Sequence, residues 1–404
     1  MSILCGHPTG NPNSFNAALA HFEHGRLAAF CVPWMPSARA LRALAAVAPI
    51  RPVAQRLARR RFEPLAGAPL VQGRPGEWLR LARRALGMGG EALSYEANEW
   101  LMRTMRAHCG RAGVTAVHAY EDCSLWQFEA ARRLGKACIY DMPIGYHAAW
   151  GELRARLARE FAEWLPAGGM AASRYERPAQ KVREMELADL VLVPSEFVAG
   201  TVRAYHPAKA VAVAPYGVDS AFWEAAPRTR RGGALRFIYA GQLSLRKGIP
   251  LLMQAWEAAA LPDCQLELVG DWRLAEGERA RLPRGVTHLP ACSRPELRAR
   301  YQAADVFVFP TYFEGFGLVL LEAMACGLPA IATHASGADP ELLGDGRGRL
   351  IAAGDLEALV ESLRWFARHA DEVPAMGSAA AAMARLRTWD RYRAAVSRAV
   401  EPFA

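Results

Sequence analysis

The sequence predicts an α/β protein built from two doubly wound, Rossmann-like domains. Its 404 residues are enough for two domains of about 150 to 200 residues each. In the first half, strand-like residues 114–120 precede a helical segment to Gly135 and a second strand at 137–140, which is the spacing of a parallel crossover unit. A fresh strand at 235–240 follows an Arg/Gly stretch at 228–233 and begins the second domain.

Composition indicates a globular protein that does not cross a membrane. Hydrophobic residues make up 52% of the chain and charged residues 22%, and no run of 18 apolar residues is present. The opening MSILCGHPTGNPN has no basic region and reaches glycine, proline and asparagine too early for a secretory signal peptide. The eight cysteines include no C-x-x-C pair, so we expect reduced thiols in a cytoplasmic protein.

The net charge of +9 is concentrated in the segment 39–84, where eleven arginines face only Glu63 and Glu77. Its densest part, 51–62, sets apolar residues beside arginines, a pattern that suits peripheral docking on an anionic membrane surface. A solvated basic face is the alternative interpretation. We expect no nucleic-acid binding, because no aromatic stacking run or reader motif accompanies the arginines.

The first domain begins with ILCGHPTGNPNSFNAALAHF, which predicts a strand, a loop containing Gly10 and Asn11, and a helix capped near Asn13 or Ser14. A second strand is expected within 26–33. Residues 36–110 are expected to be mostly helical, with a Gly/Pro break at 64–76.

Four polar side chains stand where strands of this domain end. His118 and Glu121 close the 114–120 strand, and Asp141 and His147 follow the 137–140 strand. Ligands of parallel sheets bind beyond the carboxyl ends of the strands, so we expect these four to gather there. A purely structural role for His118 is the competing interpretation.

The end of the first domain is read from ADLVLVPSEFV at 188–198, a strand followed by a helix that Ser195 caps. A linker, PYGVDSAFW at 215–223, comes next. We therefore divide the chain into domains at 1–215 and 216–387 and a closing helical segment at 388–404.

Two adjacent cations mark the first loop of the second domain. Gly241 ends the 235–240 strand, and Arg246 and Lys247 lie on the loop that leads into a helix. An arginine fork and a lysine point charge beside a helix start are well suited to a diphosphate. A charged surface without function is the ordinary alternative.

Residues 309–333, FPTYFEGFGLVLLEAMACGLPAIAT, set polar chemistry inside a strand, turn and helix pattern. Glu314 lies at the turn, and Gly315 and Gly317 let the backbone approach a ligand. The N–H groups of Phe316 to Leu318 begin the helix and could receive an anion. Glu322 lies one turn or more inside it. Two carboxylates beside a phosphate-binding helix start suggest a nucleotide sugar.

These segments together resemble the retaining glycosyltransferases of the GT-B fold, specifically glycosyltransferase family 4. The resemblance rests on the Glu-x7-Glu spacing of 314 and 322, on GQLSLRKGIPLLMQAW at 241–256, on 188–198 and 215–223, and on the tail PELLGDGRGRLIAAGDLEALVESL at 340–363. They follow one another in the family's order across most of residues 184–365. No one of these segments would be specific alone.

The resemblance implies two Rossmann-like domains facing each other across a cleft, with the 388–400 helix crossing back to the first domain. It implies that the diphosphate is received by Arg246, Lys247 and the N–H groups of Phe316 to Leu318. The donor site would also be lined by Gly241 and by Gly315 to Leu318. Glu322 would hold the ribose, and Glu314 would hold the sugar. Transfer would retain the anomeric configuration without a cofactor or bound metal.

The acceptor side is less closely specified. The resemblance places the loop with Gly10, Asn11 and Asn13 against the acceptor, with a plain turn and N-cap as the alternative. His118, Glu121 and His147 are further candidates for acceptor contacts. Many family members carry a catalytic histidine just after the strand that matches 137–140. Here Asp141 follows that strand and His147 comes six residues later, so either could take its place, and we favour Asp141 as the catalytic residue.

Two other kinds of function remain open at this stage. A GT-B epimerase or phosphorylase shares the fold, and a non-catalytic protein could bind a nucleotide sugar in support of another transferase. The sequence does not identify the donor's base or sugar. It also leaves open whether the acceptor is a glycan, a lipid-linked sugar or a small molecule.

Overall fold

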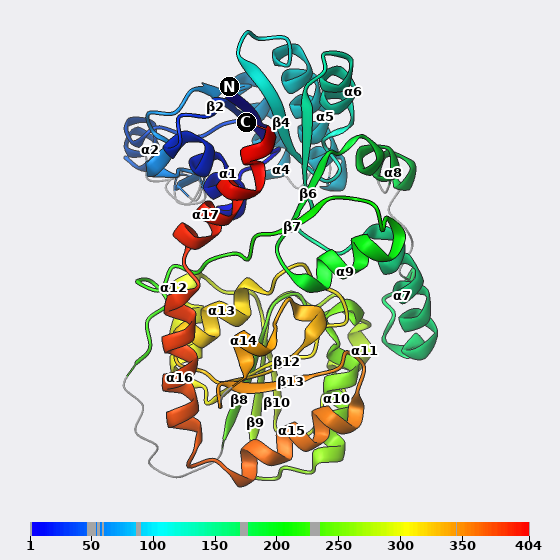
Figure 1. Cartoon of the computed structure of the whole chain (residues 1–404). Helices are drawn as coiled ribbons and strands as arrows, with labels where there is room; N and C mark the ends of the chain where they lie inside the picture. The colour runs from blue at the N-terminus through cyan, green and yellow to red at the C-terminus, as the bar shows by residue number, and fades with distance from the viewer. Residues whose placement is uncertain are drawn as a thin grey trace.

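The computed structural model describes residues 2–46, 60–85, 90–169, 177–226, 235–344 and 346–403, together with Ala54, Leu57 and Ala58. Two lobes, each an α/β sandwich around one parallel sheet, lie one above the other (Figure 1). The prediction of two doubly wound domains is therefore confirmed.

The first lobe contains a seven-stranded parallel sheet in the order β3-β2-β1-β4-β5-β6-β7. The 26–33 segment supplies its second strand as expected, whereas the two-residue β3 was not foreseen within 36–110. The strands are β1 (Ser2–Gly6), β2 (Leu27–Cys31), β3 (Leu70–Val71), β4 (Val114–Tyr120), β5 (Ala137–Asp141), β6 (Leu190–Val193) and β7 (Val211–Val213).

Helices of the first part of the chain cover both faces of that sheet. They are α1 (Pro12–Glu23), α2 (Ala38–Ala45), α4 (Arg74–Ala85), α5 (Gly90–His108), α6 (Leu125–Arg133), α7 (His147–Glu160), α8 (Pro178–Leu187) and α9 (Glu196–Tyr205), with 3-10 turns η2 (Glu63–Leu65) and η3 (Ala162–Trp164). The densest part of the basic segment lies mostly outside the described residues.

The second lobe contains a six-stranded parallel sheet in the order β10-β9-β8-β11-β12-β13. Near-continuous apolar runs such as Val306–Phe309 form its central strands because both faces are covered. The strands are β8 (Arg236–Ala240), β9 (Gln265–Val269), β10 (Val286–Leu289), β11 (Val306–Phe309), β12 (Ala330–Thr333) and β13 (Gly348–Ile351).

The helices of the second lobe and the closing helix complete the fold. They are α10 (Ile249–Ala259), α11 (Glu276–Arg279), α12 (Arg294–Ala303), α13 (Leu318–Ala325), α14 (Pro340–Leu343), α15 (Leu356–Arg368), α16 (Val373–Leu386) and α17 (Trp389–Val400). The 3-10 turns are η4 (Leu245–Lys247), η5 (His334–Ser336) and η6 (Glu401–Phe403). No helix in the described ranges combines the length and apolarity needed to span a membrane.

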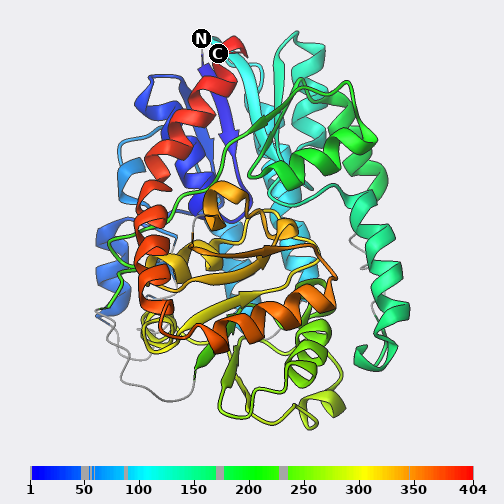
Figure 2. The ribbon, with the colours of Figure 1, turned by 60° about the horizontal axis from the view of Figure 1, so that its bottom comes forward.

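Two segments tie the lobes together. Helix α17 returns to the first lobe and lies beside α1 (Figures 1 and 2), where Arg393 donates to Glu23 at 2.9 Å and to Asn16 at 3.0 Å. In the opposite direction, α7 and η3 pack on the second lobe, because Leu157 and Trp164 are buried in the core of that lobe. The predicted first domain, 1–215, thus includes a segment that packs on the second.

Candidate active site

The loop between β8 and α10 is shaped by close backbone approaches. Gly248 has φ of 72°, and a Cβ there would lie 2.1 Å from the carbonyl oxygen of Pro310, the residue after β11. Only glycine fits that conformation and that gap. The turn η4 is therefore pressed against the end of β11, and its cations face the loop that carries Glu314.

Arg246, Lys247 and Glu314 converge as the sequence predicted. Arg246 Nη1 donates to the carbonyl oxygen of Phe313 at 2.7 Å and to Glu314 Oε2 at 3.3 Å. Lys247 Nζ pairs with the same carboxylate oxygen and lies 4.8 Å above the ring of Phe309. The three charged side chains are 23%, 11% and 15% exposed, so two cations share one carboxylate in a largely dehydrated place.

The local electrostatics favour an additional anion. Burial, and then the charge of Arg246, lower the pKa of Lys247 to about 6. A carboxylate in direct contact with an ammonium group favours its charged form, so we take Lys247 to be protonated beside Glu314 at neutral pH. Burial also lowers the pKa of Arg246. One carboxylate does not neutralise two cations, so the site carries a surplus of one positive charge.

The turn before α13 differs from the expectation in one respect. The N–H of Gly317 donates to Ser336 O at 2.9 Å, and the N–H of Leu318 donates to Phe316 O at 2.9 Å, closing a tight turn at Gly317 with φ −73° and ψ 80°. Two of the three N–H groups assigned to the diphosphate are therefore engaged by the main chain. In this conformation the side-chain cations provide the main attraction for an anion.

Glu322 lies further along α13, in separate surroundings from Glu314. Its carboxylate has a hydrogen bond with Trp223 and is attracted by Arg294, while burial raises the pKa of Glu322 to about 7. The Arg294 guanidinium lies 5.2 Å above the ring of Trp223. Trp223 and Arg294 were not predicted as site residues. Trp223 does lie inside the 215–223 segment, whereas nothing in the sequence distinguished Arg294.

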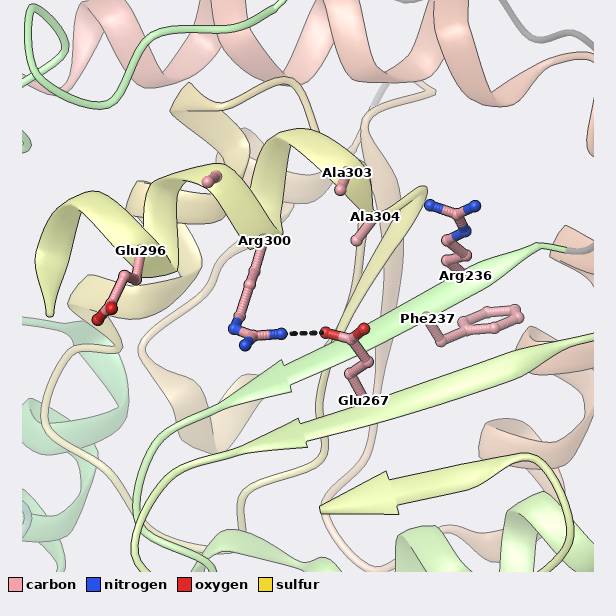
Figure 3. A pocket seen from close by; sticks show the side chains of 8 residues that line it. Arg236, Phe237, Glu267, Glu296, Arg300, Ala303 and Ala304 are labelled. Atoms are coloured by element: carbon pink, nitrogen blue, oxygen red, sulfur yellow. Dashed lines mark hydrogen bonds and ion pairs between the residues drawn. The ribbon is translucent and has the colours of Figure 1, made fainter. Parts of the chain in front are cut away.

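A pocket of the second lobe lies away from these groups. Its walls include Arg236, Glu267 and Arg300, and Arg300 pairs with Glu267 at 3.3 Å (Figure 3). Arg236 is the first residue of β8, whereas Arg246 and Lys247 follow the last. The pocket is therefore near the amino ends of the strands, at the opposite edge of the sheet from the convergent charges.

The first loop of the first lobe forms a cap. Asn11 accepts from the N–H of Ser14 at 2.9 Å and caps α1, so the cap lies at Asn11 rather than at Asn13 or Ser14. The N–H of Gly10 donates to His7 Nδ1 at 2.9 Å. The Asn13 amide donates to Tyr216 Oη at 3.0 Å and is buried. The loop therefore contains an N-cap at Asn11, and the Asn13 side chain is bonded to the linker.

His118 belongs to the core, which contradicts its assignment as an acceptor contact. It is 0% exposed, its Nε2 lies 3.4 Å from Asp141 Oδ2, and its Nδ1 lies 2.9 Å from His21 Nε2. If Nε2 donates to Asp141, Nδ1 must accept from His21. Both ring nitrogens are then engaged. A side chain without exposed surface cannot contact an acceptor without rearrangement.

The same region contains a group of side chains with metal-ligand chemistry. Ligand atoms of Cys5, His21 and His118 lie within 4.8 Å of one another, all buried. The hydrogen bonds from His21 to His118 and from His118 to Asp141 account for most of the polar atoms without an ion. Burial raises the pKa of the Cys5 thiol well above its ordinary value, which disfavours the thiolate that a metal would need.

Asp141 ends β5 and is almost completely buried. Burial raises its pKa, and the hydrogen bond with His118 opposes the shift. His147, the rival for the same role, begins α7 among different charges. Burial and then Lys181 lower the pKa of His147, while Asp122 raises it. The two candidates for the place of the family histidine therefore have separate surroundings.

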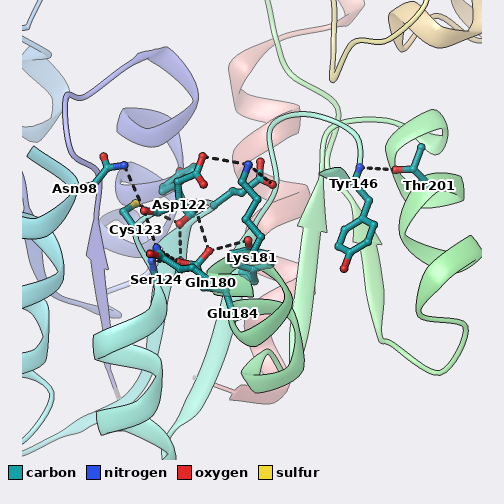
Figure 4. Close-up of polar contacts among 12 residues, drawn as sticks. Asn98, Asp122, Cys123, Ser124, Tyr146, Gln180, Lys181, Glu184 and Thr201 are labelled. Atoms are coloured by element: carbon teal, nitrogen blue, oxygen red, sulfur yellow. Dashed lines mark hydrogen bonds and ion pairs between the residues drawn. The ribbon is translucent and has the colours of Figure 1, made fainter. Parts of the chain in front are cut away.

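Glu121 is committed to an ion pair. Lys181 Nζ lies 3.2 Å from Asp122 Oδ2 (Figure 4) and 3.1 Å from Glu121 Oε1. Burial raises the pKa of Glu121 to about 7. Below this pair, Glu184 accepts from the N–H of Ser124 at 2.9 Å and from Tyr140 Oη at 2.9 Å. This network secures the β4–α6 turn, so Glu121 has a structural partner that the sequence did not reveal.

The fold defines the class of protein. The sucrose-phosphate synthase of Thermosynechococcus elongatus has a similar structure. The match covers 99% of this chain and 95% of that chain, with a TM-score of 0.63 and 17% sequence identity. Anabaena HepE, solved in complex with UDP and glucose, matches over 100% of both chains with a TM-score of 0.61 and 17% identity. The chain has the GT-B glycosyltransferase fold.

Sequence similarity narrows the class further. Residues 224–383 match the family model "Glycosyl transferases group 1". The D-inositol 3-phosphate glycosyltransferase of Pseudarthrobacter chlorophenolicus is 35% identical over 219 residues, 46% of this chain and 51% of the relative. A glycogen synthase of Mycobacterium tuberculosis is 28% identical over 155 residues, 37% of each chain. The chain spans about half the length of the first of these relatives, and the match to the group 1 glycosyltransferase model lies within residues 224–383.

Proposed function

We propose that the protein transfers a sugar from a nucleotide-sugar donor to a hydroxyl of an acceptor, with retention of the anomeric configuration and without a bound metal. The observation that supports this most directly is the convergence of Arg246 and Lys247 on Glu314 at the carboxyl edge of the second sheet. Ligands of such sheets bind beyond that edge. The family match of residues 224–383 includes all three side chains.

The leaving diphosphate is the natural partner of the two cations. In the reaction the bond between the anomeric carbon and the phosphate oxygen breaks, and the acceptor oxygen bonds to the same face of that carbon. The acceptor's proton passes to the leaving phosphate oxygen. Negative charge therefore grows on the diphosphate, where Arg246 and Lys247 stabilise it most in the transition state. Glu314 exchanges its cationic partners for sugar hydroxyls.

The nucleoside end of the donor is proposed to lie toward Glu322. Its carboxylate would accept hydrogen bonds from the two ribose hydroxyls, which favours the ionised form. Trp223 and Arg294 fix this carboxylate from the linker and from α12. The two glutamates would thus hold opposite ends of one donor.

The acceptor is proposed to enter from the first lobe. Asp141 stands at the carboxyl end of β5, and Gly10, Asn11 and His147 belong to neighbouring loops of the same sheet. Relatives are named for an inositol phosphate and for glycogen synthesis. We therefore propose a hydroxyl-bearing acceptor in general terms, whether a glycan, a lipid-linked sugar or a small molecule.

Docking to an anionic membrane through residues 39–84 is part of the proposal. None of the residues of α2, which carries Arg39 and Arg42, is buried, and Trp78 and Leu79 are 53% and 63% exposed. Apolar and cationic groups together suit a surface of anionic lipid. Sedimentation with vesicles that contain phosphatidylglycerol, compared with neutral vesicles, tests this, and equal sedimentation would contradict it.

The donor is tested first by thermal shift against UDP-, GDP-, ADP- and dTDP-sugars, since a ligand that binds only the folded state raises the melting temperature. Turnover of the stabilising donor with candidate acceptors, followed by NMR of the product's anomeric proton, tests transfer and retention. Rearrangement of the donor alone would favour an epimerase. Donor binding without turnover would favour a non-catalytic partner, and binding of no donor would overturn the proposal.

A further inference from the structure

Phe313 belongs to the second lobe, but its ring is buried against segments that come from the first domain in sequence. It follows β11 in the chain and is 3% exposed. Its ring centroid lies 5.5 Å from that of Trp150 and 5.5 Å from that of Phe197, and a Cβ on Gly145 would lie 2.4 Å from Phe313 Cζ. The β5–α7 loop, α7 and α9 thus form a fitted socket for this one ring.

The next two residues alternate between the lobes. Glu314 turns back to Arg246 and Lys247. Gly315 returns to the first lobe, where its carbonyl oxygen accepts from Ser195 Oγ at 2.7 Å. A Cβ on Gly315 would lie 1.6 Å from the carbonyl oxygen of Pro143, so the two backbones are as close as glycine permits. Glu314 is therefore held on both sides by contacts with the first lobe.

We propose that Phe313 is a positioning residue that makes the placement of Glu314 and Arg246 depend on contact between the lobes. The inference rests on the proposed function and deepens it. The carbonyl of Phe313 is an acceptor for Arg246 Nη1, so a shift of the ring's backbone moves both the cation and the carboxylate. Separation of the lobes draws the ring away from Phe197 and from the β5–α7 loop, whereas Trp150 of α7 packs against the core of the second lobe. The donor site is then complete only when the first lobe is in place.

The decisive variants lie in the socket, away from the charges. Gly145→Ala places a methyl group against the Phe313 ring, whereas Gly151→Ala, in α7, meets no atom within 4 Å and is the matched control. We expect Gly145→Ala to lower kcat by about 10-fold or more, because misplacement of site groups by about 1 Å has effects of this size. Gly151→Ala should keep the wild-type rate and melting temperature, or raise the latter.

A second substitution separates positioning from simple damage. Phe313→Leu shortens the side chain and lowers kcat in the wild-type background, but in Gly145→Ala it removes the clash and restores several-fold of the lost rate. Phe313→Leu thus lowers kcat in one background and raises it in the other. Residues in contact can show such a reversal, whereas the effects of independent sites add. Multiplicative losses in the double variant, or a Gly145→Ala variant as active as Gly151→Ala, would overturn the inference.

Solution scattering of the free proteins supplies a readout that does not need turnover. We expect a larger radius of gyration for Gly145→Ala than for Gly151→Ala, and a return toward the wild-type value in the double variant. Ser195→Ala deletes the hydrogen bond to Gly315 and also the cap that Ser195 Oγ provides to the N–H of Val198 in α9, and it should lower kcat in the same direction. If the wild-type protein transfers no sugar, the proposed function fails. Equal radii of gyration in all variants would instead refute the inference that Phe313 couples the donor site to contact between the lobes, whatever the activity.

Discussion

Replacement of Lys247 by methionine tests the proposed charge stabilisation most directly. Methionine keeps most of the length of the side chain and its packing over Phe309, but removes the ammonium group. Two unit charges about 4 Å apart attract by about 4 kcal/mol at an effective dielectric constant of about 20. Loss of one charge-stabilising donor typically costs ~2.7 to ~4 kcal/mol of transition-state stabilisation, so kcat should fall ~100- to ~1000-fold.

The fold should survive this substitution. Burial disfavours the Lys247 ammonium, as its lowered pKa indicates, and Arg246 remains to pair with Glu314. We therefore expect a melting temperature within a few degrees of the wild type. Arg281→Met is the control, because Arg281 is 78% exposed and pairs with Glu278 at the surface. The assay is kcat at saturating donor and acceptor. A kcat for Lys247→Met within threefold of the Arg281→Met value would refute the reasoning.

Five further results are expected. Because burial raises the pKa of Glu322 to about 7, donor affinity measured by titration calorimetry should increase from pH 6 to pH 8 as the carboxylate ionises; the same pH profile in Glu322→Gln would contradict this. The buried carboxylate costs stability as pH rises through about 7, so Glu322→Gln should gain melting temperature over the wild type on the alkaline side. Asp141→Asn should lower kcat more than His147→Asn if Asp141 takes the catalytic place, and the reverse order assigns that place to His147. Gly217→Ala places a Cβ 2.2 Å from the main chain at the start of α17 and should lower the melting temperature, whereas Gly200→Ala, with no atom within 4 Å, should not. Activity should survive EDTA, and a loss that Mg²⁺ restores would contradict the metal-independent mechanism.

The charged residues of the proposed donor half could be predicted from the sequence because their chemistry is local. Arg246 and Lys247 are adjacent, and Glu314 lies in a short turn between a strand and a helix, so the motifs indicate both the residue types and the elements that carry them. Parallel topology then brings the ends of β8 and β11 to one edge. Local pattern, sheet topology and the family resemblance together predicted that these three charges lie in one site.

The acceptor half could not be predicted equally well, because its polar groups are partnered across long sequence separations. Glu121 pairs with Lys181, 60 residues away, and His118 meets His21, 97 residues away. A polar side chain at the end of a strand is available to a ligand only if no side chain from another element already pairs with it. Sequence spacing contains no such information, so His118 looked like a contact and is a core residue.

For two glycines of the 309–333 segment, the structure gives a physical reason that differs from the one the motif suggested. The sequence favours glycine at 315 and 317 for close approach to a ligand, but a Cβ at Gly315 would collide with Pro143 of the other lobe, and one at Gly317 with the ring of Phe309, 2.7 Å away. Gly315 is needed because two backbones meet there. The segment that supplies the carboxylate of the proposed donor site thus also lies where the lobes meet, and a substitution at Gly315 would impair both at once.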